Sequence, residues 1–185
     1  MKIFQNIMTL IYLLMGIIVL MIAEYLATSD AWFIPYLVFA VIMLYGSMNL
    51  VVVARDKAGR NQMKNYIHGA SAIFIAVIVL ITSFVSDNTI YISCVVWAVW
   101  SIFKEGHTFQ NEMFGKIMNK TMLILNIVLS VAICIFSALM IIDPLKHIHA
   151  HVVLLGIEWI LEAVNAFVFA ITKKKVNVRE QGKNE

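Results

Sequence analysis

The strongest constraint on the fold is a series of apolar runs, each about as long as a lipid bilayer is thick. There are six, at about Ile7–Ala27, Phe33–Val53, Tyr66–Phe84, Thr89–Phe109, Thr121–Ile142 and His151–Ile171. A helix needs roughly 20 mostly apolar residues to cross the hydrocarbon core. Because lipid offers no hydrogen bonds to the backbone, each run is expected to be helical. The sequence therefore predicts an all-α, polytopic membrane protein with six transmembrane helices.

Composition supports a lipid-covered exterior. Hydrophobic residues make up 62% of the chain and charged residues only 14%, with a mean hydropathy of +0.88. A water-soluble domain carries about a quarter charged residues. The expected partner is therefore the lipid bilayer, and the net charge of +3 is interpreted as an orientation signal and not as a nucleic-acid footprint.

Positive charges predict the orientation. The chain has 14 Lys and Arg residues, and in a six-helix weave all except Lys146 fall on the side of the N-terminus. Basic residues favour the cytoplasmic side, so both termini are expected there. Residues 1–172 are predicted to form a single membrane domain, and residues 173–185 a flexible, basic cytoplasmic tail.

Short connections on the outer side are expected to join the helices into three hairpins, over residues 7–53, 66–109 and 121–171. Each outer turn carries a dipeptide with one aspartate after an aliphatic run: Ser29-Asp30, Ser86-Asp87 and Asp143-Pro144. These pairs recur about every 57 residues, a period typical of an internal repeat. The predicted fold is therefore three copies of one two-helix unit.

The last unit also shows a family resemblance. The segment Leu155–Ala163, LGIEWILEA, follows the Asp143-Pro144 turn. It resembles the third repeat of the HdeD family, bacterial acid-resistance membrane proteins built from a short repeat of unknown function. The resemblance covers the whole chain in architecture and Leu125–Ala170 in residue detail. It implies a bacterial cytoplasmic membrane and a link to acid stress, and it brings no established catalytic residues.

The last apolar run carries the strongest candidate site. Glu158, Glu162 and Asn165 are spaced i, i+4, i+7, which places them on one helical face. Carboxylates inside a membrane usually face a bundle interior or a water-filled cavity. Three interpretations stay open: a proton-titratable site or polar pathway, neutral acids that hold neighbouring helices together, and a contact between subunits.

The repeat predicts partners for this face. Aligning Ala40, Ala98 and Gly156 brings two sets of residues to matching positions: Asn49, His107 and Asn165, and Gly46, Lys104 and Glu162. If the units pack around a pseudo-threefold axis, Lys104 or His68 is expected to pair with Glu162.

Three histidines lie in the last outer loop: His147, His149 and His151. In an extended segment their alternation points all three imidazoles one way, as a metal site with Asp143 would need. Histidine charges between pH 5 and 8, so a pH-responsive cluster is the second interpretation. A solvated polar loop is the third. No metal or other cofactor is predicted.

The sequence has none of the common catalytic or nucleotide-binding motifs, so a non-enzymatic role is expected. The favoured hypothesis is a bacterial acid- or stress-resistance membrane protein that responds to pH through the outer histidines and the intramembrane carboxylates. The alternatives are a small oligomeric channel or transporter for ions, protons or a solute, and a structural or assembly partner of another membrane protein.

Overall fold

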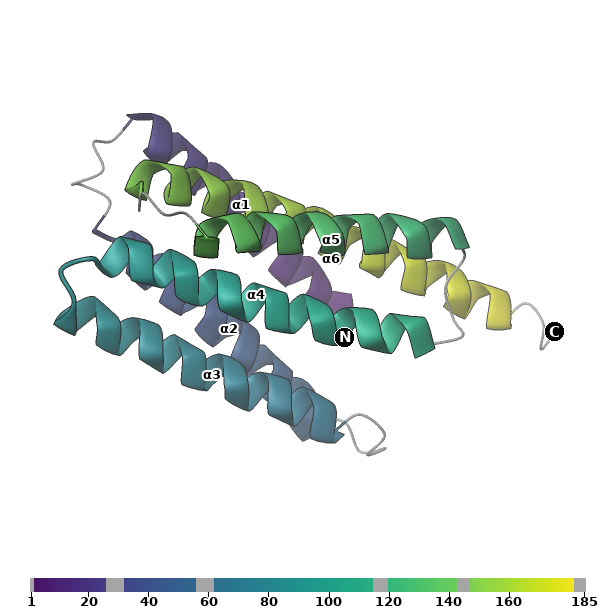
Figure 1. Cartoon of the computed structure of the whole chain (residues 1–185). Coiled ribbons are helices and arrows are strands. Elements are labelled where there is room, and N and C mark those ends of the chain that lie inside the picture. Colours follow the sequence, from purple (N-terminus) through teal and green to yellow (C-terminus); the bar gives the residue numbers. More distant parts are fainter. Residues whose placement is uncertain (1, 26–31, 56–61, 115–119, 143–146, 182–185) are drawn as a thin grey trace.

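The computed structural model describes residues 2–25, 32–55, 62–114, 120–142 and 147–181. These residues form six helices and short turns, with no strand among them. The helices, labelled in Figure 1, are α1 (Lys2–Tyr25), α2 (Ile34–Arg55), α3 (Gln62–Val85), α4 (Thr89–Phe114), α5 (Lys120–Ile142) and α6 (Ile148–Gln181). The all-α prediction is confirmed.

Five of these helices are long and apolar enough to cross a membrane: α1, α2, α3, α5 and α6. The sixth, α4, is the exception, because its second half carries Lys104, Glu105 and a run of polar residues from His107 to Glu112. The segment Thr89–Phe109, expected to be a sixth span, is therefore a helix that does not reach the hydropathy of the others.

The exterior of the bundle differs from that of a water-soluble protein, because it carries many large apolar side chains. Large apolar residues such as Leu10, Phe74 and Ile135 are exposed, whereas Glu105 and Glu158 are buried. An exterior rich in large apolar side chains is stable when lipid covers it. The described helices therefore form a bundle suited to a bilayer.

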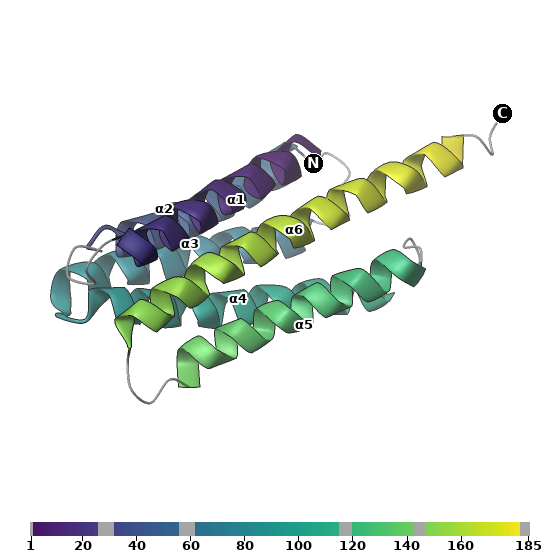
Figure 2. The ribbon, with the colours of Figure 1, turned by 90° about the horizontal axis from the view of Figure 1, so that it is seen from above.

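The closest helix pairs are α1 with α6, α2 with α3, and α4 with α5. Figure 2 shows α6 running between α1 and α5, and α4 packs against α2, α3, α5 and α6. The short outer connections, in contrast, join helices that pack less closely, most clearly α1 and α2. The predicted hairpins are thus not the units of closest packing in this bundle.

Glycines allow two of the close pairs to form. A Cβ on Gly46 of α2 would lie 2.9 Å from the carbonyl oxygen of Gly69 on α3. A Cβ on Gly16 of α1 would lie 3.0 Å from the carbonyl oxygen of Gly156 on α6. Small residues let helix backbones approach closely, as is common inside membranes.

The last helix is longer than the sequence predicted. Residues 173–181 continue α6 and do not form an irregular tail, since neither Gly nor Pro interrupts them before Gly182. At its other end α6 begins at Ile148, so His149 and Ala150 are helical and not part of a loop.

The two ends of the bundle differ in charge. Figure 1 shows that α2, α4 and α6 end on the side where α3 and α5 begin. We call this the basic end, because Arg55, Lys120 and Lys173–Lys175 belong to it. The opposite end carries Glu24, Asp87 and His147.

Replacing Gly46 with Ala should destabilise the bundle by about 1–3 kcal/mol, because the new methyl group must displace the α3 backbone. The free energy of unfolding in mixed detergent micelles measures the effect. The matched control is Gly106→Ala on α4, where a Cβ meets nothing within 4 Å. That change should be neutral or stabilising by about 0.5–1 kcal/mol. Equal effects at the two glycines would contradict the proposed close crossing.

Candidate functional site

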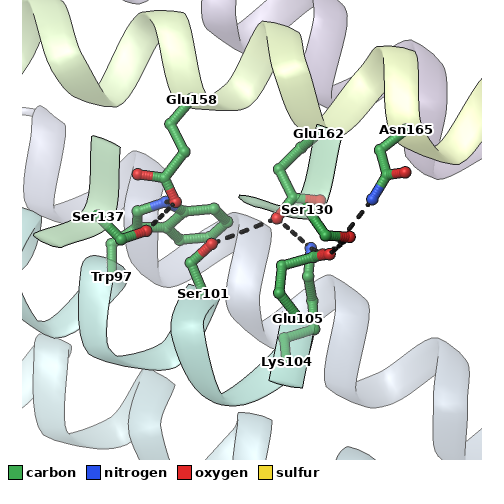
Figure 3. Close-up of polar contacts among 9 residues, drawn as sticks. All are labelled: Trp97, Ser101, Lys104, Glu105, Ser130, Ser137, Glu158, Glu162 and Asn165. Atoms are coloured by element: carbon green, nitrogen blue, oxygen red, sulfur yellow. Dashed lines mark hydrogen bonds and ion pairs between the residues drawn. The ribbon is translucent and has the colours of Figure 1, made fainter. Parts of the chain in front are cut away.

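The helices α4 and α6 run in the same direction, and their facing side chains meet at successive levels. The contacts are Trp97–Glu158, Ser101–Glu162 and Glu105–Asn165, separated in sequence by 61, 61 and 60 residues. A nearly constant separation means that the two helices are parallel and in register. Figure 3 shows these side chains pointing toward one another between the helices.

An ion pair lies at the middle level. The ammonium group of Lys104 contacts Oε1 of Glu162, and it lies 3.6 Å from Oε1 of Glu105. Its Nζ also lies 5.3 Å from the ring centre of Tyr12 on α1 and 6.0 Å from that of Tyr45 on α2. Aromatic faces attract cations at such distances, so four helices contribute to holding this one charge.

Glu105 is held by the helices on its other side. The Ser130 hydroxyl on α5 donates to Oε2 of Glu105 at 2.5 Å, and Asn165 Nδ2 donates to the same oxygen at 3.3 Å. The side chain of Glu105 therefore connects α4 with both α5 and α6. Among the described residues no donor hydrogen-bonds the Asn165 amide oxygen, which is buried.

Glu158 has a different environment. Trp97 Nε1 donates to its Oε1 at 3.1 Å, and the Ser137 hydroxyl on α5 donates to the same oxygen at 2.9 Å. Its second oxygen, Oε2, is buried and has no hydrogen-bond partner among the described residues. The Ser101 hydroxyl, 3.3 Å from Glu162 Oε1, lies between the Glu158 and Glu162 side chains in Figure 3.

Charge is unbalanced in this cluster. Lys104 is 6% exposed, and Glu105, Glu158 and Glu162 are 2%, 0% and 3% exposed. Three ionised carboxylates and one ammonium would give three negative charges against one positive, a net charge of −2. We call these four residues, with the Ser, Trp and Asn side chains that hydrogen-bond them, the core acid cluster.

The structure brings together most of the predicted polar face. Glu158, Glu162 and Asn165 are all buried and all contact α4. The ion pair that the repeat alignment predicted between Lys104 and Glu162 is present.

The other predicted partners lie elsewhere. Asn49 donates to the carbonyl oxygen of Tyr45 on its own helix. His68 of α3 packs against the ring of Phe103, with ring centres 6.1 Å apart. The backbone of His107 is part of α4, and its side chain lies outside the described ones.

The outer histidines do not form the predicted cluster. His149 Nε2 contacts the carbonyl oxygen of Ala23 on α1. The ring of His151 is fully buried and contacts the carbonyl oxygens of His147 and Met140. Because α6 begins at Ile148, successive side chains turn by about 100 degrees and cannot all point one way. No three His, Cys, Asp or Glu side chains of the described residues gather to hold a metal ion, and Asp143 lies outside those residues.

The buried histidine of this group, His151, has both ring nitrogens facing carbonyl oxygens, at 2.9 Å for Nδ1 and 2.8 Å for Nε2.

Sequence reasoning missed Glu105 and the serines. Glu105 directly follows Lys104, and only the lysine was considered as a partner for α6. A second charged residue inside an apolar run also indicates a buried polar site. On α5, Asn126, Ser130 and Ser137 are spaced i, i+4, i+11, so they share one helical face. All three are buried. That periodicity was readable from the sequence.

The chain matches no protein-family model, no curated protein and no solved structure.

Removing the ammonium group should strongly destabilise the bundle. Lys104→Met leaves Glu162 buried without its counter-ion, at an expected cost of about 3 kcal/mol in the free energy of unfolding. The double variant Lys104→Met/Glu162→Gln should recover part of this loss, because the orphaned charge is gone.

The control for that experiment is Arg55→Met, at an exposed position of the basic end. It should change stability by no more than about 0.5 kcal/mol. Lys104→Met and Glu162→Gln are also measured separately. If the stability loss of the double variant Lys104→Met/Glu162→Gln equals the sum of these two losses, Lys104 and Glu162 do not stabilise each other.

Proposed function

We propose that this chain is a non-enzymatic, multi-pass membrane protein that binds protons in its core and so responds to acid. The observation that carries the proposal is the burial of three carboxyl groups around a single ammonium group. Functional sites in membranes commonly contain such ionisable residues.

Neutralisation is the physical reason. Each unpaired ion costs several kcal/mol to bury, even after relaxation of the surroundings. Lys104 balances one carboxylate, and the described helices place no second basic group in hydrogen-bonding contact with the other two. Protons supply the missing positive charge. Glu158 is the favoured acceptor, because its Oε2 has no donor among the described residues and the ion pairs of Lys104 are with Glu162 and Glu105.

Six membrane crossings, with both termini in the cytoplasm, are part of this proposal. The bias of Lys and Arg supports that orientation, and α1 begins at the basic end where α6 ends (Figure 2). Helix α4 can cross the membrane despite its lower hydropathy, because its charged residues Lys104 and Glu105 are covered by neighbouring helices and not by lipid. We also propose a bacterial cytoplasmic membrane and a role in acid resistance, which the resemblance of Leu155–Ala163 to the HdeD family implies.

Transport of protons or another small ion is the second candidate. The specific observation in its favour is the line of polar contacts between α4 and α6, which extends over Trp97–Glu105 and Glu158–Asn165. A transporter predicts pH-dependent flux into liposomes that Glu162→Gln abolishes. A protein that only binds protons shows none.

Infrared spectroscopy of the protein in lipid tests proton binding directly. A protonated carboxyl group has its own carbonyl stretch, and we expect this band between about pH 5 and 8 in the unmodified protein. Glu158→Gln should remove a component of the band. The control Glu24→Gln, at an exposed carboxylate near the end of α1, should leave it unchanged. Absence of a protonated carboxyl band over this range would refute the proposal.

Acid resistance is tested in cells. A strain that lacks this chain should survive an acid challenge less well, and the unmodified chain should restore survival. A chain with Glu158→Gln and Glu162→Gln together should not. Full restoration by that variant would separate the carboxyls from acid resistance.

A further inference from the structure

We infer that the core acid cluster exchanges protons with the basic end of the bundle only, and that an apolar layer seals it from the opposite end. This inference rests on the proposed function, since it names the side from which the same proton site is reached.

The apolar layer begins beside Glu158 and extends toward the start of α6. Its side chains come from α4, α5 and α6 and are at most 2% exposed: Cys94, Trp97, Met140, Val152, Leu155 and Trp159. Trp97 belongs to the core acid cluster through its Nε1 and to this layer through its ring. The two indole rings pack edge to face, with centres 5.4 Å apart. Such close-packed apolar side chains leave little room for water.

The titratable groups near this layer on the far side from the cluster are His151 and Tyr91. His151 is seven residues before Glu158, about 10 Å along a helix. Its ring nitrogens face the carbonyl oxygens of His147 and Met140, toward the opposite end. Tyr91 packs against the same imidazole, 4.8 Å between ring centres. The thiol of Cys94 is a weak donor in the middle of the layer.

Polar contacts continue in the other direction, toward the basic end. From Ser101 they pass to Glu162, Lys104 and Glu105, with each group in contact with the next or within 3.6 Å of it. From there the Ser130 hydroxyl and the Asn165 amide, both bonded to Glu105, lead one level further.

A buried acceptor marks the next step. The amide oxygen of Asn165 receives no hydrogen bond from the described residues, although buried polar atoms almost always have a partner. Trp159 Nε1 is unpartnered too, but it lies among apolar side chains, whereas Asn165 bonds Glu105. A buried water needs several polar partners, so the amide oxygen is the better place for one. Beyond this level the sequence of α4 is mostly polar: His107-Thr108-Phe109-Gln110-Asn111-Glu112. Such a sequence favours hydration between the cluster and the basic end.

Titratable groups on the surrounding helices also lie near the cluster. Tyr12 and Tyr45, from α1 and α2, present their rings to Lys104. His68 of α3 packs on Phe103. From α5 the titratable neighbour is Cys134, which is half-buried. The carboxyls thus exchange protons along α4 and α6. In the proposed orientation the cluster then follows the pH of the cytoplasm and not that of the exterior.

A one-sided pH change tests this. The full chain with Trp32→Phe and Trp100→Phe is reconstituted into phosphatidylcholine–phosphatidylglycerol liposomes, and orientation is sorted by protease cleavage at Lys173–Lys175. Emission from Trp97 and Trp159 then reports on the carboxyl group of Glu158. After a drop from about pH 7.5 to about 5, the emission should change at least about tenfold faster when acid is added on the tail side, since the other route crosses an apolar layer.

Matched variants locate the route. Asn165→Leu should slow the response from the tail side, whereas Asn49→Leu should not. The two asparagines are similarly buried, at 7% and 9% exposure, but Asn49 donates to the carbonyl oxygen of Tyr45 on its own helix, whereas Asn165 donates to Glu105. Glu158→Gln should abolish the response from both sides.

The outcomes separate the two proposals. Equal rates from both sides, or a faster response from the side opposite the tail, would overturn the sealed route and leave proton binding intact. No response from either side, together with no protonated carboxyl band, would overturn both. The comparison of the two sides uses the unmodified cluster, so it holds even if Asn165→Leu fails to fold.

Discussion

The pairing of Lys104 with Glu162 inside an apolar bundle is the interaction on which the rest of the structure depends. Charges in lipid are costly unless they are covered and paired. Helix α4 therefore packs against α2, α3, α5 and α6, and Tyr12 of α1 closes over the ammonium group. Helices α1, α2, α3 and α5 carry many of the exposed apolar residues. The bundle is arranged around its least apolar helix.

The three carboxyl groups have distinct partners, and this distinction gives the cluster its chemistry. Glu162 contacts the cation directly, Glu105 has a serine, an asparagine and the cation at 3.6 Å, and Glu158 has an indole and a serine. A group whose charge is already balanced keeps its form when the surroundings change. A group held by neutral donors, with one oxygen left over, is free to gain or lose a proton.

Much of the fold was predictable because it follows from solvent and periodicity. The apolar runs located all six helices, and the spacing of Glu158, Glu162 and Asn165 located the polar face of α6. The pairing of helices was less accessible. Turn lengths fix which helices are neighbours in sequence, but the close approach of α1 to α6 depends on Gly16 meeting Gly156 across the whole chain.

The register between α4 and α6 differs from the offset of the repeat alignment, yet the expected contact forms. The repeat alignment paired residues 58 apart, as in 162 minus 104, whereas the three hydrogen-bonded levels are 60 or 61 apart. Lys104 still reaches Glu162 because its long side chain spans the difference, close to one helical turn. The histidine prediction depended on an extended backbone. Because α6 begins at Ile148, the alternate side chains at 147, 149 and 151 do not point in one direction.

The length of α6 has a mechanical consequence. It is one helix from Ile148 to Gln181 and holds Glu158 and Glu162 in its first half. From Glu162 to Gln181 a continuous helix extends by nearly 30 Å. A helix is stiff over that distance, so a rotation that repacks the carboxyls against α4 also turns the lysines at 173–175 about the same axis. Any such rotation would therefore be transmitted to the far end of α6 on the basic side.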